Sequence, residues 1–241
     1  MEGPGVKVIS EKLKFLNDCI IEEVGGNSKK IEKEKLVGKK IKNVFSYGKN
    51  LLIEIENKRY IKIHFLMYGS YSIDKKTKDD KYIRLYIKTC NRTVYFYNCS
   101  VNFLDKIDFK GQDILSETYD YTKALNDLKN YDGYICDALL DQNIFPGIGN
   151  IIKVEALFRA KIHPLSLVKN IPDKNLLKLI KEAREFSKIF YTCRQKGERL
   201  KKYLLCYGKR ICPICGNKIT IRRTGVKDRI SYYCEECQKL Y

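Results

Sequence analysis

The sequence contains no apolar run near the roughly 20 residues that a membrane-spanning helix needs, which excludes a transmembrane segment. Its first residues also lack a basic stretch followed by an apolar one, the pattern of a secretory signal peptide. Internal repeats and low-complexity segments are absent as well. We therefore expect a soluble, intracellular protein whose 241 residues form one large or two small domains.

Acidic residues are few relative to basic ones. The chain has 29 Asp and Glu against 47 Lys and Arg, a formal net charge of +18. Such an excess attracts polyanions at long range, either nucleic acid or an anionic membrane. Lys, Ile, Asn and Tyr are all abundant, as in proteins from AT-rich genomes, so the net charge alone is weak evidence for such a partner. The positions of the charges matter more.

Ten cysteines are present, and in a reducing compartment they are not expected to form a disulfide framework. Six are scattered and are interpreted as small buried apolar residues: Cys19, Cys90, Cys99, Cys136, Cys193 and Cys206.

The other four cysteines form a C-x2-C-x18-C-x2-C pattern, Cys212, Cys215, Cys234 and Cys237. Each pair places two thiolates on one tight turn, so the spacing predicts one structural zinc ion with four sulfur ligands. A redox role fits poorly, because two pairs at this spacing do not resemble a thioredoxin-type motif.

Between these pairs, Ile219–Thr224 and Arg229–Tyr233 are expected to form a hairpin that turns at 225–228. Basic side chains decorate it, and on a basic zinc-binding protein they favour contact with phosphates over a merely solvated face. These residues are Arg222, Arg223, Lys227 and Arg229.

The pattern along the chain predicts α and β regions in separate blocks. A helix is expected over residues 6–21, where Val6, Ile9, Leu13, Leu16 and Ile20 recur at helical steps. Six short strand-like runs follow and favour a β-sandwich or barrel: Ile41–Val44, Leu51–Ile55, Tyr60–His64, Ser70–Ile73, Tyr82–Ile87 and Thr93–Asn98.

After residue 119 the apolar period becomes helical. The predicted helices are Tyr121–Leu128, Ile135–Gln142, Ile151–Ala160 and Asp173–Tyr191, the last with Asp173 as N-cap. We therefore predict a helix and β-sandwich domain over 1–112, a helical domain over 113–205 and a small cysteine module over 206–241.

A glycine-rich turn interrupts two of these helices in "DQNIFPGIGNIIKVEALF", Asp141–Phe158. Gly147 and Gly149 allow close backbone approach, and Asn150 stands where an N-cap belongs. Free N–H groups at a helix start form a natural phosphate site. A glycine turn between helices is also a common structural device, but the basic charge and the hairpin favour DNA phosphate.

In this order, the N-terminal "EGP", "YGKNLL", "HFLMYGS", "LLDQNIFPGIGNII" and the four-cysteine finger resemble the formamidopyrimidine/endonuclease VIII family of DNA glycosylases. The resemblance covers essentially the whole chain. In the second half, "YTCRQKG" and the x18 spacing look closest to the glycosylase domain of the third vertebrate endonuclease VIII-like enzyme. The resemblance implies a β-sandwich, a helix–two-turn–helix domain and a zinc finger, with DNA bound in the cleft and the oxidised base flipped out.

The resemblance also gives the first residues a catalytic role, where position alone would suggest a loose tail. The α-amine of Met1 would attack the sugar C1′, with a Schiff base and β-elimination following. An α-amine with a pKa of about 7.7–8.0 is partly neutral near neutral pH. Glu2 would act as general acid on the ring oxygen. Lys49 would hold the flanking phosphate and polarise the site; its plain alternative is a solvated turn lysine.

Further family positions imply contacts with DNA. His64 matches a phosphate-contact position, although a strand histidine satisfied by the backbone is the alternative. Met67 matches the wedge that fills the gap left by the flipped base, which requires it to be exposed. Asn150, with Gly147 and Gly149, would bind a DNA phosphate at the helix turn, and Arg229 would bind the same DNA backbone.

Two departures from the family pattern affect these expectations. Glu2 follows Met1 directly, and a bulky second residue should block removal of the initiator, so either Met1 supplies the amine or a residue is missing from the sequence. The family segment "YNDPRRF" is here "YNCSVNF", residues 97–103, without either arginine. Only Met67 and Phe103 remain to fill the void, which predicts weak reading of the opposite base and tolerance of single-stranded DNA.

The leading hypothesis is a monomeric, bifunctional DNA glycosylase/AP lyase that binds damaged single- or double-stranded DNA in the nucleus or another site of replication and removes hydantoins, formamidopyrimidines or oxidised pyrimidines. One alternative is a non-catalytic damaged-DNA-binding protein with the same fold. Another, a zinc-ribbon protein of RNA metabolism, explains the charge and the finger but leaves "MEGPG" and the helix turn unexplained.

Overall fold

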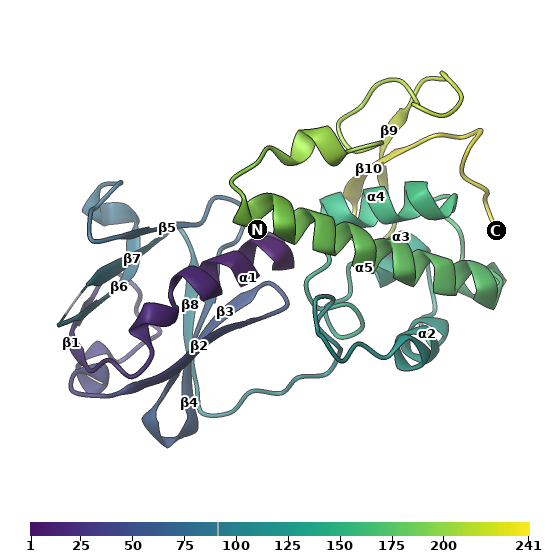
Figure 1. The fold of residues 1–241 in the computed structure, drawn as a ribbon. Helices are drawn as coiled ribbons and strands as arrows, with labels where there is room; N and C mark the ends of the chain where they lie inside the picture. Colours follow the sequence, from purple (N-terminus) through teal and green to yellow (C-terminus); the bar gives the residue numbers. More distant parts are fainter. Residues whose placement is uncertain (91) are drawn as a thin grey trace. The chain divides into compact units, whose positions relative to one another are not determined.

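The computed structural model describes residues 1–90 and 92–241, and these fold as two compact units (Figure 1). The first unit comprises Met1 and Gly5–Asp108. The second comprises Glu2–Pro4 and Phe109–Tyr241, so the cysteine module belongs to the same unit as the helical region. The division into three domains stays a prediction.

The first unit is a β-sandwich of two antiparallel sheets. One sheet has the order β2-β3-β4-β8, formed by Ile41–Tyr47, Asn50–Ile55, Arg59–His64 and Ser100–Leu104. The other has the order β1-β6-β7-β5, formed by Ile21–Gly25, Ile83–Thr89, Thr93–Tyr97 and Ser70–Ile73. Apolar residues from both sheets and from helix α1 (Gly3–Lys12) form one core, which confirms the predicted architecture.

The six predicted strands are present within three residues at either end, but β1 and β8 were not predicted. The helix predicted over 6–21 is wrong beyond Lys12, where a 3₁₀ turn over Lys14–Leu16 follows. Asn17 is then extended, with φ of −59° and ψ of 139°, and Asp18 takes a left-handed conformation with φ of 64°, so no helix continues through this segment. Ile20 consequently points outward and is 57% exposed.

The second unit is built from helices α2 (Tyr121–Lys129), α3 (Ile135–Ala138), α4 (Asn150–Ala160) and α5 (Asp173–Gln195), with the hairpin strands β9 (Thr220–Thr224) and β10 (Arg229–Tyr233). The long helix α5 runs beside α4 (Figure 1). The remaining 3₁₀ segments are Lys33–Leu36, Glu56–Lys58, Asp80–Tyr82, Val168–Asn170 and Leu200–Tyr203.

Two details of the predicted helices are wrong. Helix α3 ends at Ala138 rather than Gln142, because the N–H groups of Leu140 and Asp141 bond to carbonyls three residues back instead of four. Asp173 is the first residue of α5 and not its N-cap, which is Pro172. The Asp173 carboxylate instead pairs with the Lys129 ammonium at 2.8 Å.

The cysteine module has a small core of its own on α4. Val154 and Phe158 of α4 pack against Cys206, Cys212, Ile219 and Cys234. Of the six scattered cysteines, Cys99, Cys136, Cys193 and Cys206 are buried as predicted. Cys19 is half-buried, and Cys90, which follows the end of β6, is exposed, so the buried interpretation is wrong for Cys90.

Candidate active site

The α-amine of Met1 lies in the first unit, at the loop that follows β4. It donates a hydrogen bond to the carbonyl oxygen of Leu66 at 2.5 Å. The same loop carries Met67, which is 68% exposed as its proposed wedge role requires. Leu66 has a φ of 48°, a strained conformation for a branched apolar residue. A strained loop therefore holds the amine beside an exposed methionine.

His64, at the end of β4, belongs to the same neighbourhood. Its Nδ1 accepts the N–H of Leu66 at 3.1 Å, so the ring is satisfied by the backbone on one side. Burial lowers the pKa of His64 below its ordinary 6.5, and the positive charges of the α-amine, Lys49 and Lys62 lower it further. The imidazole is therefore neutral near pH 7, and the amine and Lys49 lie within electrostatic range of it.

Glu2 begins the second unit, where its carboxylate caps helix α4. One oxygen accepts the N–H of Ile151 at 2.7 Å and the other accepts the N–H of Ile152 at 3.3 Å. The backbone N–H of Gly3 donates to the carbonyl of Gly147 at 2.9 Å. The partial positive charge of a helix N-terminus stabilises a carboxylate in this position.

Gly149 is required by this arrangement. A Cβ at position 149 would lie 2.3 Å from the carboxylate carbon of Glu2, closer than carbon atoms approach without bonding. Two of the helix-start N–H groups that the sequence assigned to phosphate thus bind the carboxylate of Glu2 instead. The N–H of Gly147 donates to the side-chain oxygen of Gln142 at 3.1 Å.

The expectation that Asn150 caps α4 is wrong, because Gly149 occupies the cap and Asn150 is the first helical residue. Its amide nitrogen donates to the carbonyl of Ile230 in β10 at 2.9 Å. Its amide oxygen is buried and has no hydrogen-bond partner among the described residues. Asn150 therefore joins the start of α4 to the hairpin, and its contact with phosphate stays a prediction.

Arg229 is the first residue of β10, beside that junction. It is exposed and pairs across the hairpin with Thr224. The hairpin runs and the turn between them match the sequence prediction. Of the other basic residues, Arg223 bonds the carbonyl and carboxylate of Asp228 at 2.8 and 3.0 Å and so braces the turn.

The four cysteines of the terminal module come together as a metal-binding cluster. Their sulfur atoms all lie within 4.8 Å of one another. The Cys212–Cys237 and Cys215–Cys234 pairs are 3.8 and 3.4 Å apart. Zinc–sulfur bonds of about 2.3 Å place tetrahedral ligands about 3.8 Å apart, so the cluster has the dimensions and the donor set of a zinc site.

Charged residues buried beside the hairpin were missed by sequence reasoning. Lys153 and Glu155 of α4 are fully buried, and Asp137 of α3 is 2% exposed. The Glu155 carboxylate accepts backbone N–H groups from Leu205, Cys206 and Tyr207 and so fixes the entry to the cysteine module. The signal in the sequence is two charged residues inside the apolar run "IIKVEALF".

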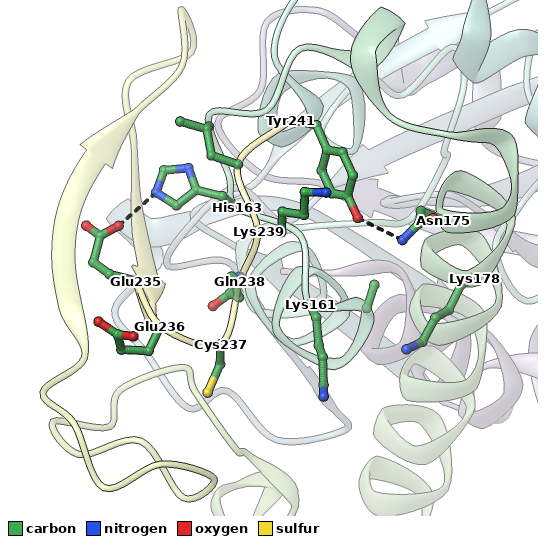
Figure 2. Close-up of a pocket in the computed structure, with 12 residues that line it drawn as sticks. Lys161, His163, Asn175, Lys178, Glu235, Glu236, Cys237, Gln238, Lys239 and Tyr241 are labelled. Atoms are coloured by element: carbon green, nitrogen blue, oxygen red, sulfur yellow. Dashed lines mark hydrogen bonds and ion pairs between the residues drawn. The ribbon is translucent and has the colours of Figure 1, made fainter.

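A cavity of about 590 Å³ lies against the C-terminal segment (Figure 2). His163 pairs there with Glu235 at 3.4 Å, and Asn175 donates to the Tyr241 hydroxyl at 2.9 Å. Cys237 is the only predicted site residue among its described lining residues. The cavity is thus distinct from the neighbourhoods of Met1 and Glu2. No helix in the described part of the chain has the length and apolar character to span a bilayer.

Comparison with known proteins identifies two matching family models. The formamidopyrimidine-DNA glycosylase N-terminal domain matches residues 2–104, and the H2TH domain of formamidopyrimidine-DNA glycosylase matches residues 111–203. Together the two models account for most of both units.

Among individual proteins, the chain is 33% identical to mouse endonuclease 8-like 3 over 81% of its own length. That match spans only 34% of the mouse protein, so the chain covers about a third of this relative. It is 30% identical to a formamidopyrimidine-DNA glycosylase from Ureaplasma parvum, over 84% of this chain and 83% of the bacterial one.

Solved structures show the same fold. The glycosylase of Lactococcus lactis, non-covalently bound to DNA containing an AP site, superposes with a TM-score of 0.87 at 22% identity, over 99% of this chain and all of the other. A viral DNA glycosylase superposes with a TM-score of 0.86 at 25% identity, with the same coverage. The chain therefore belongs to the formamidopyrimidine-DNA glycosylase/endonuclease VIII family.

Proposed function

We propose that this chain is a bifunctional DNA glycosylase/AP lyase that removes oxidised bases from DNA. The observation that supports the proposal is the way in which the Glu2 carboxylate is bound at the start of α4. A carboxylate next to the α-amine in the chain is held by two N–H groups at the start of α4, over a glycine that leaves room for nothing larger. A carboxylate that follows a primary amine directly in the chain is suited to acid–base work on a sugar that the amine attacks.

The proposed reaction uses the neutral α-amine as nucleophile. Its nitrogen forms a bond to C1′ of the damaged nucleotide while the bond from C1′ to the base breaks and the base leaves with the electron pair. The Glu2 carboxylate takes the proton that the amine loses on attack and gives it to the ring oxygen as the bond between that oxygen and C1′ opens, which leaves a Schiff base. Loss of a proton from C2′ expels the 3′ phosphate and cuts the strand.

The surroundings of the amine support this use. Positive charge from Lys49 and Lys62 acts on the same region as the α-amine, as the lowered pKa of His64 shows. Positive charge in this region attracts the phosphates of DNA towards the amine. Lys49 and neutral His64 are proposed to hold the phosphates that flank the lesion, since both can donate hydrogen bonds to phosphate oxygens.

We propose that a structural zinc ion is bound by Cys212, Cys215, Cys234 and Cys237, whose sulfur atoms are close enough to share one ion. Bound there, zinc would hold the hairpin as a folded unit. Arg229 and Asn150 are then the proposed phosphate contacts of this unit, and the net charge of +18 supports DNA as the partner.

We also propose that the enzyme accepts single-stranded as well as duplex DNA. Met67 is exposed, whereas Phe103 of β8 packs against the core of the first unit and lies 5.8 Å from the Arg59 guanidinium. One exposed wedge and no arginine in "YNCSVNF" leave few groups to recognise the base opposite the lesion. Loss of the second strand should therefore cost little activity.

A strand-cleavage assay tests the proposal. Oligonucleotides with a single hydantoin or formamidopyrimidine lesion are incubated with the protein, both as single strands and as duplexes. We expect the shortened product of β-elimination from both forms, and its loss in Glu2→Gln. Tight binding of the lesion without any cleavage would instead identify a non-catalytic damage-binding protein, and single-strand cleavage tens of fold slower than duplex cleavage would overturn the strand preference.

A further inference from the structure

Lys153 is a fully buried lysine whose ammonium faces the hairpin from helix α4. It donates to the hydroxyl of Ser231 in β10 at 2.9 Å. Ser231 in turn lies 2.6 Å from the hydroxyl of Thr224 in β9, and both hydroxyls are buried. A chain of polar contacts thus runs from α4 through both strands of the hairpin.

Asp137 of α3 holds the other end of the hairpin. Its two carboxylate oxygens accept the N–H groups of Val226 and Lys227 at 2.8 and 3.0 Å. Gly225, which directly precedes these two residues, has a φ of 72°, and a Cβ there would lie 2.3 Å from a carboxylate oxygen of Asp137. The turn is therefore shaped to fit against this one carboxylate.

Titratable and charged groups act on Lys153 from α3, from β10 and from the start of the chain. Cys136 and Asp137 of α3 and Glu2 at the start of the chain favour its charged form, whereas Arg229 of β10 opposes it. Burial acts most strongly and lowers the pKa of Lys153 to about 8. A buried ammonium in such a place is costly for stability compared with an apolar residue of similar length, so packing alone does not explain a lysine at this position.

We propose that Lys153 and Asp137 are positioning residues that lock the hairpin onto α3 and α4 and so set Arg229 and Asn150 for DNA. Three successive residues of β10 have different surroundings. Arg229 is exposed, Ile230 accepts the Asn150 amide at 2.9 Å, and Ser231 accepts the Lys153 ammonium. An isolated two-stranded hairpin is at best marginally stable, so buried bonds to the helices decide where its basic residues point. The inference rests on the proposed function, since it assumes that Arg229 contacts DNA.

A double-mutant cycle tests this role. Binding to duplex DNA with an uncleavable abasic-site analogue is measured for Lys153→Met, Arg229→Ala and the double variant. We expect each single change to weaken binding about tenfold and the double variant to bind no more weakly than either. We also expect the slope of log Kd against log salt to fall in magnitude by about 1 in Lys153→Met, as for loss of a phosphate contact. Lys178→Met, which removes an exposed lysine of α5, is the matched control and should leave Kd within about twofold.

Further measurements separate positioning from general destabilisation. The single-turnover rate at saturating enzyme should stay near the wild-type rate in Lys153→Met, because the loss lies in binding. Zinc content and Tm report whether the variant folds; should it fail to fold, Asp137→Asn, which keeps the size of the side chain, takes its place in the cycle.

Two results would overturn the inference, each with a different meaning. One is that Arg229→Ala weakens DNA binding while Lys153→Met does not, or that the two losses of affinity multiply in the double variant. In either case the bonds of Lys153 to the hairpin have no role in placing Arg229. If Arg229→Ala itself leaves Kd unchanged, the DNA contact proposed for Arg229 is wrong and the inference falls with it.

Discussion

The α-amine of Met1 and the Lys49 ammonium both act electrostatically on the imidazole of His64. The loop after β4 holds the amine through the Leu66 carbonyl, and burial together with the neighbouring positive charges lowers the pKa of His64. A crowded set of cations is unfavourable by itself. A phosphate bound among them would relieve that repulsion, so the arrangement favours an anionic ligand.

His64 should therefore titrate below its ordinary pKa of 6.5, and Lys49→Met should raise its pKa by removing one of the positive charges. Burial is the largest cause, so the pKa should rise only part of the way towards 6.5. Proton NMR of the imidazole signals measures this. His163, the other histidine of the sequence, lies in the second unit, and its pKa is the internal control; a shift of both histidines or of neither would contradict the arrangement.

Lys153 makes a prediction about stability and pH. Its pKa is lowered from 10.5 to about 8 in the folded chain, so between these values the unfolded chain binds the extra proton. Stability from this residue therefore rises with pH over that window. The free energy of unfolding of the wild type minus that of Lys153→Met should increase by up to about 3 kcal/mol between pH 7.5 and pH 10.5. Urea unfolding at several pH values measures it, and a difference that stays flat would show that Lys153 is not buried as a charge.

At the scale of elements, the start of helix α4 joins three distant parts of the sequence. Glu2 binds its first N–H groups, Asn150 reaches the hairpin, and Lys153 lies one turn further along. The helix thereby sets the orientation of both the proposed acid and the proposed phosphate contacts. Changes at Gly149 should therefore affect catalysis, whereas changes at Asn150 or Lys153 should affect DNA binding.

Gly149→Ala tests the close contact between Gly149 and the Glu2 carboxylate. The new methyl group meets the carboxylate, so we expect a loss of about 1–3 kcal/mol in unfolding free energy and of most strand cleavage. In a Glu2→Ala background the obstacle is gone, and the same Gly149→Ala change should cost clearly less, about 0.5 kcal/mol, which is the difference between glycine and alanine at an N-cap. Equal costs in both backgrounds, measured by urea unfolding, would contradict the contact.

Removal of metal tests the cysteine cluster. One zinc per chain is expected by emission spectrometry, and a chelator should release it together with four reactive thiols. Because the hairpin carries Arg229, affinity for the abasic-site analogue should fall at least about tenfold on removal and return when zinc is added back. Full affinity in the metal-free protein would exclude a role for the finger in DNA binding.

At the scale of the whole molecule, the sequence predicted local features well and distant contacts poorly. The hairpin and cysteine cluster were predictable because their spacing is local, and the β-sandwich because its strands are short and regular. The Glu2–Ile151 bond joins residues 149 positions apart, and no local pattern signals it. For the same reason Asn150 was given the capping role that Glu2 fills from elsewhere, and Lys153 could be recognised only as a charge in an apolar run.

Covalent trapping tests the proposed attack of the α-amine on the sugar most directly. The protein is incubated with abasic-site DNA and borohydride, which reduces a Schiff base to a stable bond, and the adduct is located by peptide mass mapping after the N-terminus has been verified. We predict an adduct on the α-amine of Met1 and the same adduct in Lys49→Met at reduced yield. An adduct on Lys49, or none at all despite tight binding, would contradict the claim.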